Sequence, residues 1–475
     1  MAEREFDAIV LGAGAPGEVC AGRLAEGGMS VAIVEPELLG GQCSYYACMP
    51  SKALLRPADV LAEARRVPGV AVDERLDGQA ILDRRDEVIH DLDDSGQLPW
   101  LEDRGIEGFR GSGALDGERR VRAGKDLLTA RRIVVVATGS DAAMPPIEGL
   151  DSVRAWNNRE GTTAKRVPES MVVLGGGPVG CELAQAWSSL GCRVTLVEAG
   201  PRLLSREEEF AGEEVEAALR ERHEVDVRTG VKAERVASLD AHPTSTTPEG
   251  GQSPMRGESH GVRVELDSGD AIDAAELLVA VGRKPRTREI GLDSVGVEPG
   301  KGGFLETDSR MRVGGREWLY AVGDVNGRAL FTHMGKYQAW VAAENALGRT
   351  VEAMAEGLGS PRVTFTDPQV AAAGLTLAQA EDAGMDARVV DVPTDGTAGA
   401  SFQGKDTGGT SRLVIDNERQ VVVGATFTGF ETADLLHAAT VAIVSETPLP
   451  KLRHAVAAYP TRSEIWLKLL EAAGL

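Results

Sequence analysis

A glycine-rich segment that occurs twice constrains the fold of this 475-residue chain more than any other feature. In each copy, an apolar run expected to be a strand leads through the glycines into a helix and a second apolar strand that ends at an acidic residue. The glycines are Gly12, Gly14 and Gly17 in the first copy and Gly175, Gly177 and Gly180 in the second. The acids, Glu35 and Glu198, stand at the same distance from the first glycine of their copy. The repeat predicts two α/β nucleotide-binding units.

The spacing of these glycines, G-x-G-x-x-G, is typical of Rossmann-like dinucleotide-binding domains. Glycines permit a tight turn and close approach of the backbone to a pyrophosphate at the helix N-terminus, and the acid can hold ribose hydroxyls. A single match is weak support, because glycines also serve turns and helix packing. Two matches with the same flanking elements favour the binding of two dinucleotides.

Strand and turn patterns divide the chain into segments 1–150, 151–280, 281–350 and 351–475. A buried strand in "IVVVATGS" is followed by prolines near residue 150, and apolar strands recur in "LLVAVGRKPRT" and "EWLYAVGDVNG". From Pro361 onward, strands such as those in "SRLVIDNERQVVVGATF" alternate with helices, which predicts an α+β domain. Segment 240–261 is rich in Pro, Ser, Thr and Gly and is expected to be a solvated loop.

Composition excludes several kinds of partner. A net charge of −22 would repel nucleic acids and anionic membranes, and no apolar stretch reaches the roughly 18 residues of a membrane span. The N-terminal residues lack the pattern of a signal peptide, so we expect a cytoplasmic protein. Five cysteines are too few for a disulfide scaffold, which directs attention to the close pair Cys43 and Cys48.

This pair lies in "GGQCSYYACMPSK" and is expected to be redox-active. Residues five apart on a regular helix are about 7.5 Å apart along its axis, so a disulfide requires a distorted first turn, and such strain favours a reducible bond. A helix N-terminus also lowers the pKa of a thiol. The alternative, two small buried apolar residues, is disfavoured by Pro50 and Lys52, which follow the pair.

The cysteine segment resembles the redox motif of the class I pyridine nucleotide-disulfide oxidoreductases, which include dihydrolipoamide dehydrogenase, glutathione reductase and mercuric reductase. The resemblance extends over the whole chain, since "ATGS", the second fingerprint, "VGRKP", "YAVGD" and a C-terminal interface domain follow in the family's order. It implies an FAD-binding domain formed by 1–150 and 281–350 and an NAD(P)-binding domain at 151–280. Segment 351–475 would form the dimerisation domain of a homodimer.

The resemblance also implies roles for individual residues. FAD would lie on the first glycine loop with Glu35 at its ribose and Asp324 at its ribityl chain, and the helix that begins near His333 would direct its amides at the flavin ring. Cys48 resembles the flavin-facing sulfur and Cys43 the interchange thiol. Lys52 would lie by the flavin and pair with Glu182, although spacing alone leaves open an ordinary solvated ion pair. The remaining cofactor-binding positions implied are Gly41, Gln42, Ala114, Thr138, Gly139, Gly282 and Gly323.

The second fingerprint favours NADH over NADPH. Glu198 would repel a 2′-phosphate, and relatives that prefer NADPH carry arginines where this chain has Ala199 and Ser205. Arg202 and Arg206 lie nearby and could still contact a phosphate, so NADPH remains possible. Pro178 stands where many relatives have an aromatic residue that gates the flavin.

The C-terminal segment departs from the family's pattern. Relatives carry a His-Pro-Thr motif with a glutamate four residues after the proline, and the histidine exchanges protons with the interchange thiol of the partner subunit. Here Pro460, Thr461 and Glu464 match, but the histidine position is Tyr459. Tyrosine has a pKa about 3.5 units above that of histidine, so it is a poor base at neutral pH. Tyr459 could instead be an interface side chain without a chemical role, and His454 could replace the histidine.

These observations favour a homodimeric enzyme in which electrons pass from NADH through FAD and the Cys43–Cys48 disulfide to a small disulfide substrate. Tyr459 and Glu464 from the partner subunit would line the shared site. Mercuric reductase also has tyrosine at this position, but the lack of a C-terminal cysteine pair and of an N-terminal metal-carrying domain disfavours mercury, and no resident metal is expected. A quinone or other acceptor reductase and a flavin-binding redox sensor are further alternatives. Dihydrolipoamide dehydrogenase is disfavoured by Tyr459.

Overall fold

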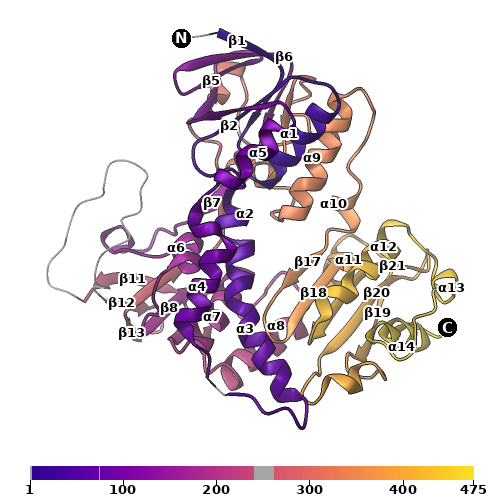
Figure 1. Cartoon of the computed structure of the whole chain (residues 1–475). Helices are drawn as coiled ribbons and strands as arrows, with labels where there is room; N and C mark the ends of the chain where they lie inside the picture. The colour runs from indigo at the N-terminus through magenta and orange to yellow at the C-terminus, as the bar shows by residue number, and fades with distance from the viewer. Residues whose placement is uncertain (1–2, 74, 240–260) are drawn as a thin grey trace. The chain divides into compact units, whose positions relative to one another are not determined.

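The chain divides into two compact units (Figure 1). The structure, a computed structural model, describes residues 3–73, 75–239 and 261–475. The loop predicted for 240–261 therefore lies, apart from its last residue, outside the described residues. Unit 1 comprises Met1–Pro50, Asp86–Asp141 and Arg283–Ser360, and unit 2 comprises Ser51–Arg85, Ala142–Gly282 and Pro361–Leu475.

Unit 1 is built on a sheet of strand order β3-β2-β1-β6-β5-β4, with β16 paired to β6. The strands are β1 (Glu3–Leu11), β2 (Val31–Glu35), β3 (Ile106–Arg110), β4 (Gly113–Leu115), β5 (Arg120–Ala123), β6 (Asp126–Val136) and β16 (Leu319–Ala321). Pairing is parallel among β3, β2, β1, β6 and β16, whereas β4, β5 and β6 pair antiparallel. The parallel strands are continuous apolar runs because both faces are covered: Val10 and Val135 are fully buried on one side and Ile9 and Val134 on the other.

Two helices of unit 1 pack side by side on this sheet, namely α1 (Ala15–Glu26) and α9 (Thr332–Ala346) (Figure 1). Small side chains such as Ala21 on α1 and Ala339 on α9 lie in their common core, so the two backbones approach closely. Shorter helices are α2 (Gly41–Tyr45), α5 (Leu98–Glu102) and α10 (Ala355–Leu358). The first strand-glycine-helix-strand pattern predicted from sequence is thus confirmed.

Unit 2 contains the second copy of the pattern in a parallel sheet of order β10-β9-β8-β14. Its strands are β8 (Ser170–Leu174), β9 (Arg193–Glu198), β10 (Asp226–Thr229) and β14 (Glu276–Val279), and its helices are α6 (Asn158–Thr163), α7 (Pro178–Ser189) and α8 (Glu209–Glu221). Beside it lies an antiparallel sheet of β11 (Ala233–Ser238), β12 (Val262–Leu266) and β13 (Ala271–Ala274). Most of α3 (Cys48–Arg66) and of α4 (Gly78–Val88) also belongs to this unit.

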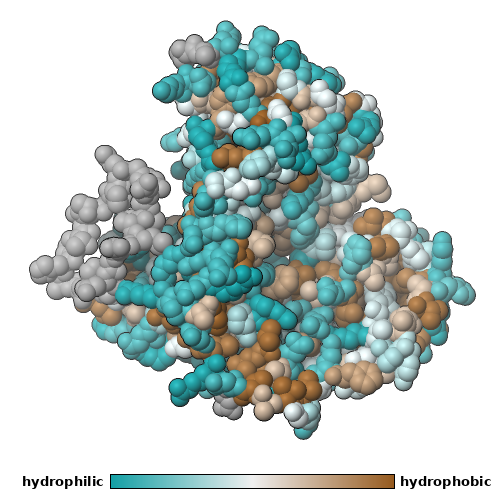
Figure 2. All heavy atoms as spheres, in the orientation of Figure 1, coloured by the Kyte–Doolittle hydropathy of each residue, from teal (hydrophilic) through white to brown (hydrophobic). Residues whose placement is uncertain are grey.

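The C-terminal part of unit 2 is an antiparallel sheet of order β17-β18-β21-β20-β19 with helices. Its elements are β17 (Arg362–Thr364), β18 (Gln369–Gly374), α11 (Leu377–Asp382), β19 (Ala387–Pro393), β20 (Thr410–Asp416), β21 (Val421–Gly429), α12 (Leu436–Val444), α13 (Leu449–Leu452) and α14 (Ile465–Ala472). Hydrophobic side chains reach the surface over α12, where Val441 and Val444 are exposed (Figure 2). The α/β fold class with a C-terminal α+β part is confirmed. Across the described ranges, no helix has the length and apolar character needed to cross a membrane.

Candidate functional site

The first glycine loop borders a cavity of about 520 Å³ in unit 1. Gly12 has φ +101° and a Cβ there would lie 2.3 Å from the Ala137 carbonyl oxygen, so only glycine fits the turn. Gly14 and Gly139 also line the cavity, and a Cβ at either would meet no atom closer than 4.0 Å. The backbone is therefore bare where a ligand would approach, as expected for a bound dinucleotide.

Glu35 ends β2 at the wall of this cavity. Its Oε2 accepts a hydrogen bond from the Ala13 amide at 2.7 Å and its Oε1 one from the Glu37 amide at 2.8 Å. Burial raises the pKa of Glu35, and these two amides oppose the rise. The carboxyl group is thus fixed by the glycine loop and can accept ribose hydroxyls.

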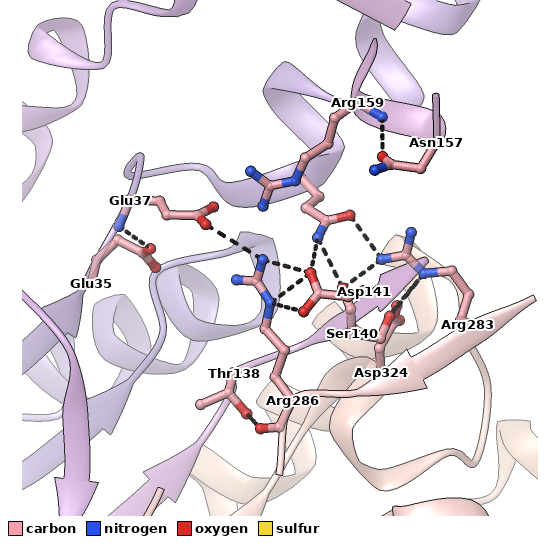
Figure 3. Close-up of polar contacts among 11 residues, drawn as sticks. Glu35, Glu37, Thr138, Ser140, Asp141, Asn157, Arg159, Arg283, Arg286 and Asp324 are labelled. Atoms are coloured by element: carbon pink, nitrogen blue, oxygen red, sulfur yellow. Dashed lines mark hydrogen bonds and ion pairs between the residues drawn. The ribbon is translucent and has the colours of Figure 1, made fainter. Parts of the chain in front are cut away.

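Arg283 organises a polar network that sequence reasoning missed (Figure 3). Its guanidinium donates to Gln42 Oε1 at 2.8 Å and to Ser140 Oγ at 2.9 Å, and Ser140 Oγ donates to Asp324 Oδ2 at 2.5 Å. The short strands β7 (Ser140–Ala142) and β15 (Arg283–Pro285) pair, which joins the "ATGS" and "VGRKP" motifs. The sequence signal that could have identified Arg283 is its position directly after Gly282, at the end of a predicted strand.

A second arginine closes another edge of the same cavity. Arg286 Nε donates to both carboxylate oxygens of Asp141 at 2.9 Å, and Arg286 Nη2 lies 3.6 Å from Glu37 Oε1 (Figure 3). Thr138 Oγ1 donates to the Arg286 carbonyl oxygen at 2.7 Å. These contacts fix the segment after β6 against the segment after β15. They form a charged rim that would suit a ligand carrying both phosphates and hydroxyls.

Cys43 and Cys48 lie on two helices rather than on one. Cys43 is in α2, which ends at Tyr45, and Cys48 begins α3. The break takes the place of the distorted first turn predicted from the spacing and brings the two thiols into hydrogen-bonding contact. The Thr332 hydroxyl, at the start of α9, contacts Cys48 Sγ at 3.4 Å and also hydrogen-bonds Cys43.

The pKa of Cys43 differs from the sequence-based expectation. The hydrogen bond with Cys48 raises this pKa above the usual thiol range, and burial raises it further. Thr332 and the charge of Lys336 act in the opposite direction but do not prevail. The lowering of the pKa expected from a helix N-terminus is therefore wrong for Cys43, whose pKa is raised by the hydrogen bond with Cys48 and by burial.

Lys52 and Glu182 form an ion pair between α3 and α7. Lys52 Nζ lies 2.6 Å from Glu182 Oε2, and the Glu182 side chain is only 7% exposed. Glu182 Oε1 accepts the Phe365 amide at 2.9 Å, while the Lys52 ammonium lies 4.7 Å from the centre of the Phe365 ring. The buried carboxylate distinguishes this pair from an ordinary solvated one.

The second glycine loop repeats the geometry of the first. A Cβ at Gly180 would lie 1.8 Å from the Gly175 carbonyl oxygen, so this glycine serves the helix–strand contact. Glu198 accepts the Gly176 amide at 2.5 Å and the Gly200 amide at 2.6 Å. The loop thereby places a fixed carboxylate at the end of β9.

Arg202 follows this carboxylate, but its guanidinium is engaged elsewhere. It donates to the carbonyl oxygens of Leu203, Leu204, Ser205 and Glu207. Arg206, in contrast, is exposed. Because its guanidinium donors are used by these carbonyl oxygens, Arg202 is poorly suited to bind a 2′-phosphate.

Other predicted cofactor residues are distributed as follows. Gly41, Gln42, Thr138, Gly323 and Asp324 line the cavity of unit 1. Four predicted residues do not line this cavity: Gly17, Ala114, Gly282 and His333. For the last three, an adjacent residue in the chain does line it, namely Gly113, Arg283 and Thr332 respectively. A Cβ at Gly17 would lie 2.0 Å from the Gly12 carbonyl oxygen, so Gly17 serves packing. The His333 ring stacks on Phe331 at 5.5 Å.

The C-terminal candidates belong to an exposed segment of unit 2. The Tyr459 side chain is 79% exposed, and His454 is also exposed. Glu464 Oε2 accepts the Thr461 amide at 3.2 Å in a capping box that begins the last helical segment. Glu464 therefore has a local structural role in the protomer.

Comparison with known proteins identifies the family. Residues 6–357 match the family described as pyridine nucleotide-disulphide oxidoreductase, and residues 360–470 match its dimerisation domain. A dihydrolipoyl dehydrogenase of Chlorobaculum tepidum is 33% identical over 81% of this chain and 79% of its own length. A mercuric reductase of Bacillus cereus is 29% identical over 97% of this chain and 70% of its own length.

Solved structures share the fold. The HOCl-induced flavoprotein disulfide reductase RclA of Escherichia coli superposes with a TM-score of 0.83 at 23% identity, covering 98% of this chain and 99% of RclA. LpdA of Mycobacterium tuberculosis superposes with a TM-score of 0.84 at 22% identity, covering 99% of each chain.

The chain belongs to the pyridine nucleotide-disulphide oxidoreductase family. It is an NAD(P)H-dependent flavoprotein disulfide oxidoreductase that uses FAD, and its dimerisation domain indicates a homodimer. The bare glycine backbone, the fixed Glu35 carboxyl group and the Arg283 network fit FAD in the cavity of unit 1.

Proposed function

We propose that this enzyme transfers electrons from NADH through FAD to the Cys43–Cys48 pair and on to a small disulfide. One observation carries the proposal: the Thr332 hydroxyl, which lines the cavity of unit 1, contacts both sulfurs. The pair therefore borders the space that fits FAD. Bound FAD supplies the chemistry that accepts a hydride and passes on an electron pair.

Within the pair, we assign Cys43 as the thiol that meets the substrate and Cys48 as the sulfur that faces the flavin. Thr332 contacts both sulfurs, and of the two cysteines it is Cys43 that borders the cavity, so the two roles are separated by a direct test. In holoprotein whose cysteines are reduced and whose flavin is oxidised, we expect a long-wavelength thiolate-to-flavin absorbance band to persist in Cys43→Ser and to vanish in Cys48→Ser. The reverse pattern would exchange the two roles.

The exchange steps balance as follows. The Cys43 thiolate attacks one sulfur of the substrate disulfide, forming a mixed disulfide and releasing the first substrate thiolate. Cys48 then attacks Cys43 in the mixed disulfide, which closes the Cys43–Cys48 bond and releases the second thiolate. The two protons from the cysteines pass to the two thiol products, and two electrons have moved from the pair to the substrate.

Tyr459 of the partner subunit is proposed to line the substrate side of this site together with Glu464. A tyrosine with a pKa near 10 is a weak proton carrier at neutral pH. A substrate whose leaving thiol has a low pKa depends less on a proton donor. We therefore propose such a disulfide rather than dihydrolipoamide, although lipoyl dehydrogenases are among the relatives.

NADH is the proposed reductant. Glu198 is held by two amides at the end of β9, where it would repel a 2′-phosphate. Arg202, one of the two nearby arginines, is bound to four carbonyl oxygens of its own loop. The fixed acid and the engaged arginine together disfavour NADPH.

A metal-thiolate reductase is the second candidate. A mercuric reductase is similar to 97% of this chain. The tyrosine at position 459 agrees with that group of enzymes. A mercuric thiolate requires no proton for its leaving group, so it suits a site without the histidine.

The proposal is tested with purified holoprotein, NADH and a panel of disulfides, mercuric thiolates and quinones. We expect turnover of a disulfide that Cys43→Ser abolishes, with Ser44→Ala as the matched control that retains it. Full turnover of the best acceptor by Cys43→Ser would refute thiol exchange and favour direct reduction by the flavin. Turnover confined to mercuric thiolates would favour the second candidate.

A further inference from the structure

A lysine lies one helical turn beyond the threonine that contacts the cysteine pair. Thr332 and Lys336 are four residues apart on α9 and therefore share one face of this helix. The first turn of α9 lies directly against the first turn of α1, because a Cβ at Gly335 would come within 2.6 Å of Pro16. Lys336 thus lies on the face of α9 that bears the threonine in contact with the cysteine pair.

The charge of Lys336 acts on Cys43. The ammonium group lowers the pKa of Cys43, although the hydrogen bond with Cys48 and burial together keep that pKa above the usual range. Lys336 itself is exposed. Within the described ranges no carboxylate lies within 4 Å of its ammonium, so its charge is not consumed by a close ion pair.

Glu18 on α1 is an acidic group whose titration responds to the charge of Lys336. Burial raises the pKa of Glu18 to about 7, and Lys336 counteracts that rise. A carboxyl group that is partly protonated near neutral pH neutralises a neighbouring cation only in part. The titratable and charged groups around this contact are Glu18, Glu35, Cys43, Tyr45, Cys48 and Lys336.

A positive charge near the Cys43 thiolate matters more in this chain than in relatives that carry the C-terminal histidine. Relatives supply a histidine where this sequence has Tyr459, and tyrosine cannot provide a cation. We propose that Lys336 is a positioning residue that stabilises the Cys43 thiolate through its positive charge. The inference rests on the proposed role of Cys43 as the attacking thiol, and it places the compensating charge within the same subunit.

The test is the pH dependence of alkylation. Holoprotein reduced with dithiothreitol is treated with iodoacetamide, and the Cys43 peptide is quantified by mass spectrometry. In Lys336→Met the midpoint for Cys43 is expected to rise by roughly half a unit, or about a threefold loss of rate below the midpoint, because alkylation requires the thiolate. Lys336→Arg should keep the wild-type midpoint. Cys20, Cys181 and Cys192 are buried and serve as slow internal references.

Lys125→Met is the matched control, since Lys125 is an exposed lysine in the turn between β5 and β6. A Lys336→Met midpoint equal to that of Lys125→Met would overturn the inference, as would an equal shift in Lys336→Arg. Lys336→Gln provides a second neutral variant should Lys336→Met fail to bind FAD. The assay uses neither NADH nor a disulfide substrate. A protein that alkylates as expected yet reduces no disulfide would overturn the proposed function and not this inference.

Discussion

Lys52 Nζ lies 2.6 Å from Glu182 Oε2, and the carboxylate is buried while the ammonium remains about a third exposed. The pair is asymmetric, because Glu182 has a second partner in the Phe365 amide at 2.9 Å. A buried carboxylate that loses its cation is more costly than a partly exposed cation that loses its carboxylate. The two residues therefore differ in what their substitution does.

Lys52→Met should cost more stability than Glu182→Gln. The first change leaves a buried charge with only an amide partner, which we expect to lower the free energy of unfolding by about 1–3 kcal/mol. The second keeps an oxygen for the Phe365 amide and leaves Lys52 able to reach water, so we expect about 1 kcal/mol or less. Urea unfolding of both variants measures the difference. Equal losses would show that burial of Glu182 does not control the pair.

Nucleotide preference should follow Glu198 and not Arg202. A Glu198→Ser, Ala199→Arg double variant replaces a fixed negative charge by a free cation, and we expect the NADH-to-NADPH ratio of kcat/KM to fall by about tenfold or more, or roughly 1.4 kcal/mol. Arg202→Ala is the matched control. It removes the clamp on the loop, so it should weaken both nucleotides alike. A ratio that changes only in Arg202→Ala would contradict this view.

Asp59 on α3 should make stability depend on pH. Burial raises its pKa from 3.8 to about 7, and Asp367 and Glu182 raise it further while Arg56 and Arg66 lower it. Between about pH 4 and 7, Asp59 keeps its proton in the folded protein but has lost it in the unfolded chain. The free energy of unfolding therefore falls as the pH rises through this window.

Asp59→Asn should therefore flatten the decline in the free energy of unfolding between pH 5 and pH 8 by about 2–4 kcal/mol. Urea unfolding at both values measures the decline. Asp103→Asn, at an exposed position, is the control and should keep the wild-type profile. Parallel profiles for wild type and Asp59→Asn would show that Asp59 is charged in the folded protein at both values.

Tyr459→His should extend the substrate range. Histidine can donate a proton to a leaving thiol of ordinary pKa, so we expect kcat/KM for lipoamide to rise by roughly tenfold or more, within the usual range of general acid catalysis. Tyr459→Phe should change turnover by no more than about twofold, since the hydroxyl is a weak proton carrier. His454→Ala should behave as wild type. A large loss in Tyr459→Phe would instead give the hydroxyl a chemical role.

Local sequence patterns predicted the parts of the fold that depend on neighbours in the chain. Gly12 and Gly175 indicate turns that require positive φ. The apolar runs beside them are strands buried on both faces. The same reasoning located the cysteine pair and the carboxylates Glu35 and Glu198. These features follow from short-range sterics and from burial, which leave a signature in the sequence.

Features that depend on distant segments left no such signature. Arg283 contacts Gln42 across more than two hundred residues of sequence, and spacing does not encode this contact. The break between α2 and α3, which brings Cys43 to Cys48, was likewise hidden, because a periodicity argument assumes one continuous helix. Lys336 became a candidate only because α9 carries it one turn beyond Thr332, which contacts the cysteine pair.

The central claim is that the Cys43–Cys48 pair accepts electrons that enter from NADH through FAD. Anaerobic titration of oxidised holoprotein with NADH, followed by flavin absorbance, tests it most directly against a Cys43→Ser, Cys48→Ser double variant. The account predicts that wild type consumes twice as much NADH per flavin as the double variant before the flavin is fully reduced, since the disulfide takes up a second electron pair. Equal consumption by the two proteins would contradict it.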